Sequence, residues 1–337
     1  MKYIIYIFII LAILFSSNYT YVKFGLYSDD IKKCNAELIY KIDSAAYTNN
    51  ILYLGESSNF TASDLDSSKE SISELISGFD QNYRIASISK GAIHASTYDL
   101  LIKRLPENSS IKTVIVTMNL RSFGINWMQS DLETNLSRAN ILYSTYPVVI
   151  KKMLLSFKAY DNQEVFKRKL EIKYHYKHDK FILGSKKYES VYEWDKELYD
   201  KGVLDEHGVK NQEKTDIACH FIKNYAFTLN EDNPRVKDFD EISEYCKNNN
   251  IKLIFHLLPE NLERATELCG SDLSDLMKQN VVFLKNRYSK DVVFIDNSSV
   301  LKDSCFIDRQ WPTEHYIYKG RYEVAKLIHE QLKLIVR

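Results

Sequence analysis

The stretch ILYLGESSNF, residues 51–60, decides the fold. Four residues with strand character lead into Gly55, and an acid, two serines and an asparagine follow at once. A strand that ends in this way either makes an ordinary turn that caps the next helix, or holds a nucleophile where a strand meets a helix. The rest of the sequence favours the second interpretation.

Strand patterns recur along the chain after this stretch. Apolar runs rich in β-branched residues at 83–89, 111–120, 251–259 and 291–299 predict four more strands, and helical patterns separate them. This alternation is typical of a parallel sheet with crossover helices. We therefore expect a three-layer α/β/α sandwich with a five-stranded parallel sheet.

The alternation lapses between residues 125 and 235, where Lys, Tyr and Asp are frequent. We predict a mainly helical insertion there, over one end of the sheet. Acidic residues are interleaved with the basic ones, and the chain has 45 Lys+Arg against 45 Asp+Glu. A chain with balanced charge has no long-range attraction to nucleic acid, so no nucleic-acid partner is expected.

The N-terminus predicts a membrane anchor at residues 1–24. No charge occurs from Tyr3 to Val22, and these 20 residues would span roughly 30 Å as a helix. A cleaved signal peptide and a buried core helix are the alternatives, although no small-x-small cleavage site follows. Lys2 favours a cytoplasmic N-terminus, which would place the body on the extracytoplasmic side, in the periplasm or at the cell surface.

Two further segments complete the predicted organisation. Residues 25–49 are a juxtamembrane segment that partly folds back as a helix, and residues 50–337 form the catalytic domain. The five cysteines have no C-x-x-C spacing, so we expect no zinc site, and we predict no cofactor. Because their number is odd, at least one thiol stays free if the others pair within the chain.

Three positions are expected to meet at one edge of the sheet. Ser57, Gly91 and Asn119 each follow a predicted strand, and open α/β sheets place their sites at the carboxyl ends of parallel strands. Asp308 and His315 lie in a loop before the last helix.

These positions carry a resemblance to the SGNH/GDSL hydrolase superfamily, whose fold is flavodoxin-like. GESSN (55–59) resembles the G-D-S block, with Glu56 in place of the usual Asp. SKGAIHAS (89–96), VTMN (116–119) and DRQWPTEHYIYKGR (308–321) resemble the later blocks in the same order. The resemblance covers most of residues 50–125 and 250–337.

The resemblance implies a role for each residue. Ser57 is the expected nucleophile, His315 its base and Asp308 the carboxylate that orients the imidazole. The expected oxyanion donors are the backbone N–H of Ser57, the N–H of Gly91 and the side-chain amide of Asn119. Ser57 as a helix cap and His315 as a surface histidine remain the alternatives.

The sequence departs from the family pattern at two places. The last block usually reads D-x-x-H, but Pro312 stands three residues before His315, and Asp308 stands seven before it. Glu314 or Asp296 could substitute for Asp308, or the third member could be missing. In the third block, Thr117 and Leu120 replace the usual Gly and Asp.

The expected function is that of a membrane-anchored SGNH-like serine esterase or O-acyltransferase. Anchored proteins of this type resemble those of alginate O-acetylation and of D-alanyl transfer to teichoic acid. That resemblance implies acyl esters of an extracytoplasmic glycan as substrate, and a membrane-bound acyltransferase as partner. A general esterase or lipase, and a non-catalytic protein that binds a glycan or a partner, are the alternatives.

Overall fold

The computed structural model describes residues 2–33, 37–160, 165–183, 186–188 and 190–335. At its centre is one sheet of five strands in the order β2-β1-β3-β8-β9, and every neighbouring pair is parallel. The strands are β1 (Ile51–Gly55), β2 (Ile85–Ser89), β3 (Thr113–Met118), β8 (Lys252–Leu257) and β9 (Val293–Asp296). The predicted fold class is therefore confirmed, strand for strand.

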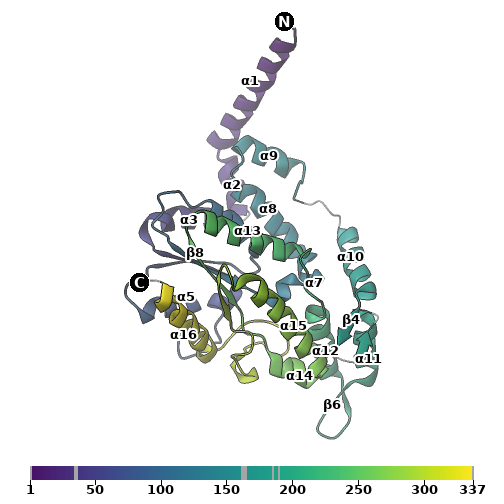
Figure 1. Cartoon of the computed structure of the whole chain (residues 1–337). Helices are drawn as coiled ribbons and strands as arrows, with labels where there is room; N and C mark the ends of the chain where they lie inside the picture. Colours follow the sequence, from purple (N-terminus) through teal and green to yellow (C-terminus); the bar gives the residue numbers. More distant parts are fainter. Residues whose placement is uncertain (1, 34–36, 161–164, 184–185, 189, 336–337) are drawn as a thin grey trace.

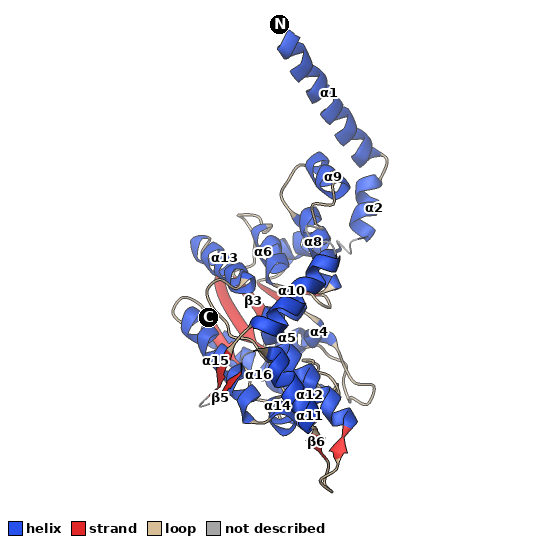
Figure 2. Cartoon of the chain, turned by 90° about the vertical axis from the view of Figure 1, so that its right-hand side faces the viewer, coloured by secondary structure: helices blue, strands red, loops and turns tan. Residues whose placement is uncertain are grey.

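Helices cover both faces of the sheet. Leu52 and Leu54 of β1 pack into one buried cluster, whereas Ile51 and Tyr53 pack into another, because successive side chains of a strand point to opposite faces. The first cluster includes α3 (Glu37–Thr48), α6 (Ala95–Lys103), α13 (Pro234–Asn248) and α15 (Ser271–Tyr288). The second includes α5 (Ile72–Phe79) and α16 (Tyr318–Ile335). Figure 2 shows the strands between α6 and α13 on one side and α5 and α16 on the other.

The predicted insertion lies between β3 and β8 and is mainly helical. Its elements are η1 (Leu120–Phe123), α7 (Ile125–Met128), α8 (Asp131–Tyr143), α9 (Val148–Ser156), α10 (Val165–His178), β4 (Phe181–Leu183), β5 (Lys186–Tyr188), α11 (Val191–Lys201), β6 (Val203–Leu204), β7 (Lys210–Asn211) and α12 (Gln212–Tyr225). The pairs β4–β5 and β6–β7 are short antiparallel hairpins that the sequence pattern did not indicate. Strands of two or three residues are too short to show a period.

The N-terminal segment begins with α1 (Lys2–Lys23), which projects from the body (Figure 1). Within the described ranges it is the one helix long and apolar enough to cross a membrane, although a signal sequence has the same features. It is followed by α2 (Leu26–Lys33) and α3. Leu38, Ile39 and Ile42 of α3 are buried in the first cluster, so part of the predicted juxtamembrane segment belongs to the core.

Two further helices follow β8: α14 (Leu262–Cys269) and, across a short turn, α15. A 3-10 turn, η2 (Asp303–Cys305), lies between β9 and α16. The four-residue helix α4 (Ser57–Phe60) follows β1, so the end of this strand leads into the predicted nucleophile.

Gly55, the last residue of β1, lies where no side chain fits. A Cβ there would be 2.6 Å from a ring carbon of Tyr53 and 3.0 Å from Ser89 Oγ. Tyr53 cannot move easily, because its ring is fully buried and its hydroxyl lies 3.2 Å from His256 Nε2. The glycine therefore allows the strand to end close against its neighbours.

We predict that Gly55→Ala lowers the free energy of unfolding by about 1–3 kcal/mol, because the added methyl group overpacks a filled interior. Urea titration of the full chain in detergent, followed by tryptophan fluorescence, measures this. The matched control is Gly78→Ala in α5, where a Cβ meets nothing within 4 Å and helix propensity favours Ala by up to about 1 kcal/mol. Equal stability of the two variants would contradict the prediction.

Candidate active site

The candidate site lies at the carboxyl edge of the sheet, beside the central strand. The strand order reverses at β1, whose neighbours are β2 and β3, and such switch points are where open α/β sheets hold ligands. Glu56 has extended backbone angles and precedes Ser57, the first residue of α4. Ser57 is half-buried, so its hydroxyl stands at the surface of this edge.

The structure brings three of the predicted site residues together. Ser57 Oγ lies 3.0 Å from His315 Nε2, although the residues are 258 positions apart. His315 Nδ1 lies 2.6 Å from Asp308 Oδ2. Since a carboxylate only accepts, Nδ1–H donates to Asp308, which leaves Nε2 as the acceptor for the Ser57 hydroxyl. This is the hydrogen-bond order that serine esterases use; the catalytic roles themselves stay predictions.

The local backbone explains how Asp308 reaches His315 across seven positions. Phe306 and Tyr316 form an antiparallel bridge, and the N–H of Ile307 donates to the carbonyl of His315 over 2.9 Å. The residues between them therefore form a closed loop whose two ends lie side by side. This loop brings the Asp308 carboxylate beside the His315 imidazole although their spacing is longer than D-x-x-H.

The two alternative carboxylates point elsewhere. Asp296 accepts from the hydroxyl and N–H of Ser298 at 2.6 and 3.1 Å. Glu314 is buried and faces Asn119 and Arg121 instead of its neighbour His315. Asp308 is thus the carboxylate that contacts the imidazole.

Asn59 fixes the turn that carries Ser57. It is buried, and its Nδ2 lies 2.9–3.1 Å from three hydroxyls, those of Ser73, Ser87 and Ser89. Its Oδ1 accepts from the N–H of Ser73 over 2.9 Å. The amide therefore ties α4 to β2 and to the start of α5, both of which are rigid elements.

The chain beyond α4 is held by a fully buried arginine of the last helix. Arg321 donates to the carbonyls of Thr61, Ser68 and Glu70 and to Asp66 Oδ2, at 2.8–3.2 Å. Burial would raise the pKa of the Asp66 carboxyl, but its hydrogen bonds and the arginine charge hold that pKa below its ordinary value. The loop after the predicted nucleophile is thereby fastened to α16.

Two of the three predicted oxyanion donors make no hydrogen bond to the residues that the structure describes. The N–H groups of Ser57 and Gly91 donate to no acceptor among the residues described, and the N–H of Lys90 bonds the carbonyl of Gly55 over 3.3 Å, which places Gly91 near the end of β1.

The side-chain amide of Asn119 has two partners that the sequence did not indicate, and its oxyanion role stays a prediction. Its Nδ2 donates to Glu56 Oε1 over 2.7 Å and to Glu314 Oε2 over 2.8 Å, so both amide hydrogens are engaged. Both carboxyl groups are buried beside the amide. Asn119 therefore links the residue before Ser57 to the residue before His315.

Asn119 belongs to a buried cluster that we call the glutamate cluster. Its members come from five separate parts of the chain: Glu56, Asn119, Arg121, Tyr225, Glu260 and Glu314. Arg121 donates twice to Glu314, at 2.7 and 3.1 Å, and the Tyr225 hydroxyl lies 2.7 Å from Glu260 and 3.1 Å from Glu314. The cluster thus contains three carboxyl groups and one arginine, which bonds Glu314.

Burial decides how these carboxyl groups ionise. It raises the pKa of Glu56 to about 7, with a further contribution from the charge of Glu314. Burial also raises the pKa of Glu260 well above its usual range. Burial alone would raise the pKa of Glu314 too, but the charge and hydrogen bonds of Arg121 outweigh it and lower that pKa. Glu314 is therefore the ionised partner of Arg121.

Sequence reasoning missed most of this cluster. Glu314 was considered only as a substitute for Asp308, and Arg121, Tyr225 and Glu260 were not considered. A signal was present in part, since Glu56 and Glu314 directly precede the predicted nucleophile and base, and Glu260 follows the strand β8. The tertiary contacts that make these acids a cluster cannot be read from spacing.

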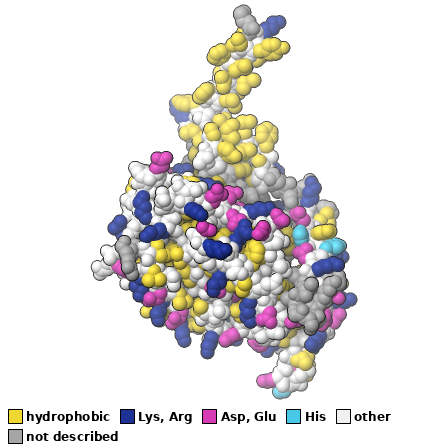
Figure 3. Space-filling model, viewed as in Figure 1, with side chains coloured by type: hydrophobic (Ala, Val, Ile, Leu, Met, Phe, Trp, Pro, Cys, Tyr) yellow, Lys and Arg dark blue, Asp and Glu magenta, His cyan; other side chains and the backbone are white. Residues whose placement is uncertain are grey.

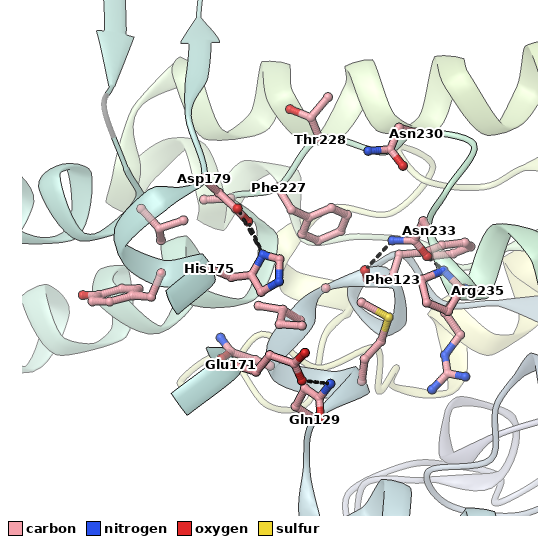
Figure 4. A pocket seen from close by; sticks show the side chains of 18 of the residues that line it. Phe123, Gln129, Glu171, His175, Asp179, Phe227, Thr228, Asn230, Asn233 and Arg235 are labelled. Carbon is pink, nitrogen blue, oxygen red and sulfur yellow. Dashed lines mark hydrogen bonds and ion pairs between the residues drawn. The ribbon is translucent and has the colours of Figure 1, made fainter. Parts of the chain in front are cut away.

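A cavity of about 670 Å³ lies apart from this site, between α7, α10 and the segment after α12 (Figure 4). Its lining includes none of Ser57, His315 and Asp308. Two pairs of its polar side chains bond each other, Gln129–Glu171 at 2.8 Å and His175–Asp179 at 3.1 Å. The cavity therefore adds no group to the Ser–His–Asp arrangement.

The cysteines and metal-binding side chains add nothing to the site. Cys219, Cys246, Cys269 and Cys305 are buried and free, and Cys34 lies outside the described residues. Over the parts of the chain that the structure describes, no three His, Cys, Asp or Glu side chains are grouped as metal ligands would be.

Comparisons with known proteins give a distant likeness. No protein-family model matches the chain, and no curated protein matches it. Among solved structures, it is similar to a proposed acylhydrolase from Bacteroides fragilis NCTC 9343, with 10% identity and a TM-score of 0.34. It is also similar to a GDSL-like lipase from Bacteroides thetaiotaomicron VPI-5482, with 8% identity and a TM-score of 0.35. Each match covers 85% of this chain and 88% of the other.

We predict that Glu56→Gln changes how stability depends on pH. Below pH 4.5 the carboxyl group is protonated in both the folded and the unfolded chain. Between pH 4.5 and about 7 only the unfolded chain loses the proton, so the free energy of unfolding of the wild type falls by up to about 3 kcal/mol. Glutamine cannot ionise, so the free energy of unfolding of the variant, relative to that of the wild type, should rise by that amount between pH 4.5 and about 7.

Urea titrations of the full chain in detergent at pH 5, 6, 7 and 8 measure the difference. The control is Glu213→Gln, at an exposed position in the first turn of α12. Its free energy of unfolding should differ from that of the wild type by the same amount at all four pH values. A constant difference for Glu56→Gln as well would contradict the prediction.

Proposed function

We propose that the chain is an SGNH-type serine esterase or O-acyltransferase that acts on acyl esters of an extracytoplasmic glycan. The observation that carries the proposal is the continuous hydrogen-bond order from Ser57 Oγ through His315 to Asp308, at 3.0 and 2.6 Å. This order occurs at the carboxyl edge of a parallel sheet, where the hydroxyl is half-buried and within reach of a substrate.

The chemistry follows from the positions of the protons. His315 Nε2 takes the proton of Ser57 as Oγ attacks the acyl carbon, and Asp308 stabilises the imidazolium that forms. The N–H groups of Ser57 and Gly91 are the donors for the oxyanion. The imidazolium then returns the proton to the leaving alcohol, and water or a second hydroxyl accepts the acyl group in the reverse sequence.

Exposed aromatic side chains beside the triad support a sugar-bearing substrate. Trp311 lies between Asp308 and His315 in the same loop, and its side chain is 55% exposed. Its ring centre lies 4.7 Å from that of His220 in α12. Phe60, three residues after Ser57, is also exposed. Flat apolar surfaces of this kind suit the C–H faces of sugar rings, which carry their hydroxyls at the edge.

The N-terminal helix supports a reaction close to a membrane. If α1 is an anchor and the body is extracytoplasmic, the tether holds the site near the outer face, where a membrane-bound acyltransferase could supply acyl groups. The acylated or acyl-accepting glycan and this acyltransferase are the partners that we propose.

A non-catalytic glycan-binding protein is the second candidate. One observation favours it: both hydrogens of the Asn119 amide are bonded to carboxyl groups, and if they stay so, the oxyanion has two donors, both backbone N–H groups. Losing a donor typically costs on the order of 100-fold in rate.

We predict that Ser57→Ala abolishes labelling by a fluorophosphonate and lowers kcat for p-nitrophenyl acetate by at least about 10³-fold, because the variant has no nucleophile. The matched control is Ser58→Ala, since the neighbouring Oγ is buried and has no partner among the described residues. That control should label and turn over like the wild type. Labelling of Ser57→Ala at the wild-type rate would exclude Ser57 and favour the second candidate.

We predict that Trp311→Ala raises KM for partially O-acetylated xylan oligomers about tenfold, through the loss of about 1.4 kcal/mol of stacking, and leaves p-nitrophenyl acetate turnover unchanged. Tyr199→Ala, an exposed aromatic position in α11, is the control. Equal effects of Trp311→Ala on both esters, or on neither, would contradict a sugar-stacking role and favour a general esterase.

A further inference from the structure

The end of α1 is built into the body of the protein. Tyr21 is only 4% exposed, and its hydroxyl donates to Asp30 Oδ2 over 2.7 Å. Lys152 of α9 lies 2.9 Å from the same carboxylate oxygen, with its Nζ 4.9 Å from the centre of the Tyr21 ring. The charge of the lysine and these hydrogen bonds outweigh burial and hold the pKa of Asp30 below its ordinary value. Helices α1, α2 and α9 are thus fastened together.

Helix α9 has one face packed on the body and one face uncovered. Leu155 and Lys151 are buried, and Lys151 Nζ donates to the carbonyl of Leu142 over 3.0 Å. By contrast Met153 is exposed, and so is Phe157 at the end of the helix, at 79%.

These side chains continue the apolar surface of α1. Figures 1 and 2 both place α9 beside the junction of α1 and α2, on the side of the body from which α1 projects. Figure 3 shows hydrophobic side chains along the projecting helix and gathered just below it. We call the exposed residues around the junction the collar patch: Val22, Phe24, Leu26, Tyr146, Met153 and Phe157.

We propose that the collar patch lies in the interface of a lipid bilayer, with α9 resting on the membrane surface beside an uncleaved α1. This inference does not depend on the proposed function. As a helix of 22 residues, α1 is roughly 33 Å long, close to the roughly 30 Å of a bilayer's hydrocarbon core. A span that fills the core ends near Lys23, so α9 lies at the level of the headgroups.

The composition of the collar patch suits the interface of a lipid bilayer. Apolar and aromatic side chains of the patch are exposed, and lysines at positions 23 and 158 are neighbours in sequence of patch residues, where long basic side chains can reach headgroups. A signal peptide that is removed would not need Tyr21 packed into the body. The contact would fix the orientation of the body against the membrane, which a flexible tether could not do.

The test uses the full chain reconstituted in phosphatidylcholine vesicles. Phe157→Trp adds a fluorophore within the patch, and Tyr199→Trp adds one on α11, which lies far from α1 in Figure 1. Emission is compared with that of the unsubstituted chain, which has three tryptophans, in vesicles with and without brominated acyl chains. The emission added by Phe157→Trp should lose most of its intensity in brominated lipid, and that added by Tyr199→Trp should not change.

Three results would overturn the proposal. Equal emission of Phe157→Trp in both lipids would show that the patch does not enter the bilayer and is covered by another copy or by a protein partner. A chain isolated from membranes whose mass lacks residues 2–23 would show that α1 is removed. Quenching of both variants would indicate non-specific adsorption of the body, and would also contradict a defined interface helix.

Discussion

The side-chain amide of Asn119 is the contact on which the site depends most. It joins Glu56 to Glu314, and these residues directly precede Ser57 and His315. Through these two hydrogen bonds, one amide after β3 connects the end of β1 to the loop that carries His315. Because the contact is buried, it is stronger than it would be in water, and it is costly to leave unmade.

The same burial limits how the glutamate cluster can be charged. Arg121 neutralises one carboxylate, so the other two can remain buried only if they are largely protonated or share a proton. The cost of keeping them there is offset by the hydrogen bonds that Asn119, Arg121 and Tyr225 make. The cluster thereby supports the residues that precede Ser57 and His315, while Asn59 ties α4 to β2 and α5 and Arg321 holds the chain after α4.

Much of the fold could be predicted because its signals are local. Five apolar runs became five strands, and the glycine that ends the first marked the turn to Ser57. The pairing of Ser57 with His315 was predicted from the resemblance of their two motifs to blocks of the SGNH/GDSL superfamily. Asp308 could not be separated from Glu314 by spacing alone, because the choice depends on a backbone bridge between Phe306 and Tyr316. The partners of Asn119 are carboxyl groups from distant parts of the chain, so spacing could not indicate them.

The central claim is that Ser57 attacks the acyl carbon with His315 as its base. The most direct measurement is peptide mass spectrometry after the full chain is mixed with p-nitrophenyl acetate and quenched in acid within the first turnover. The account predicts one acetyl group on the peptide that contains Ser57, and none in a His315→Ala chain treated in the same way. An acetyl group on another residue, or equal acetylation of Ser57 without His315, would contradict it.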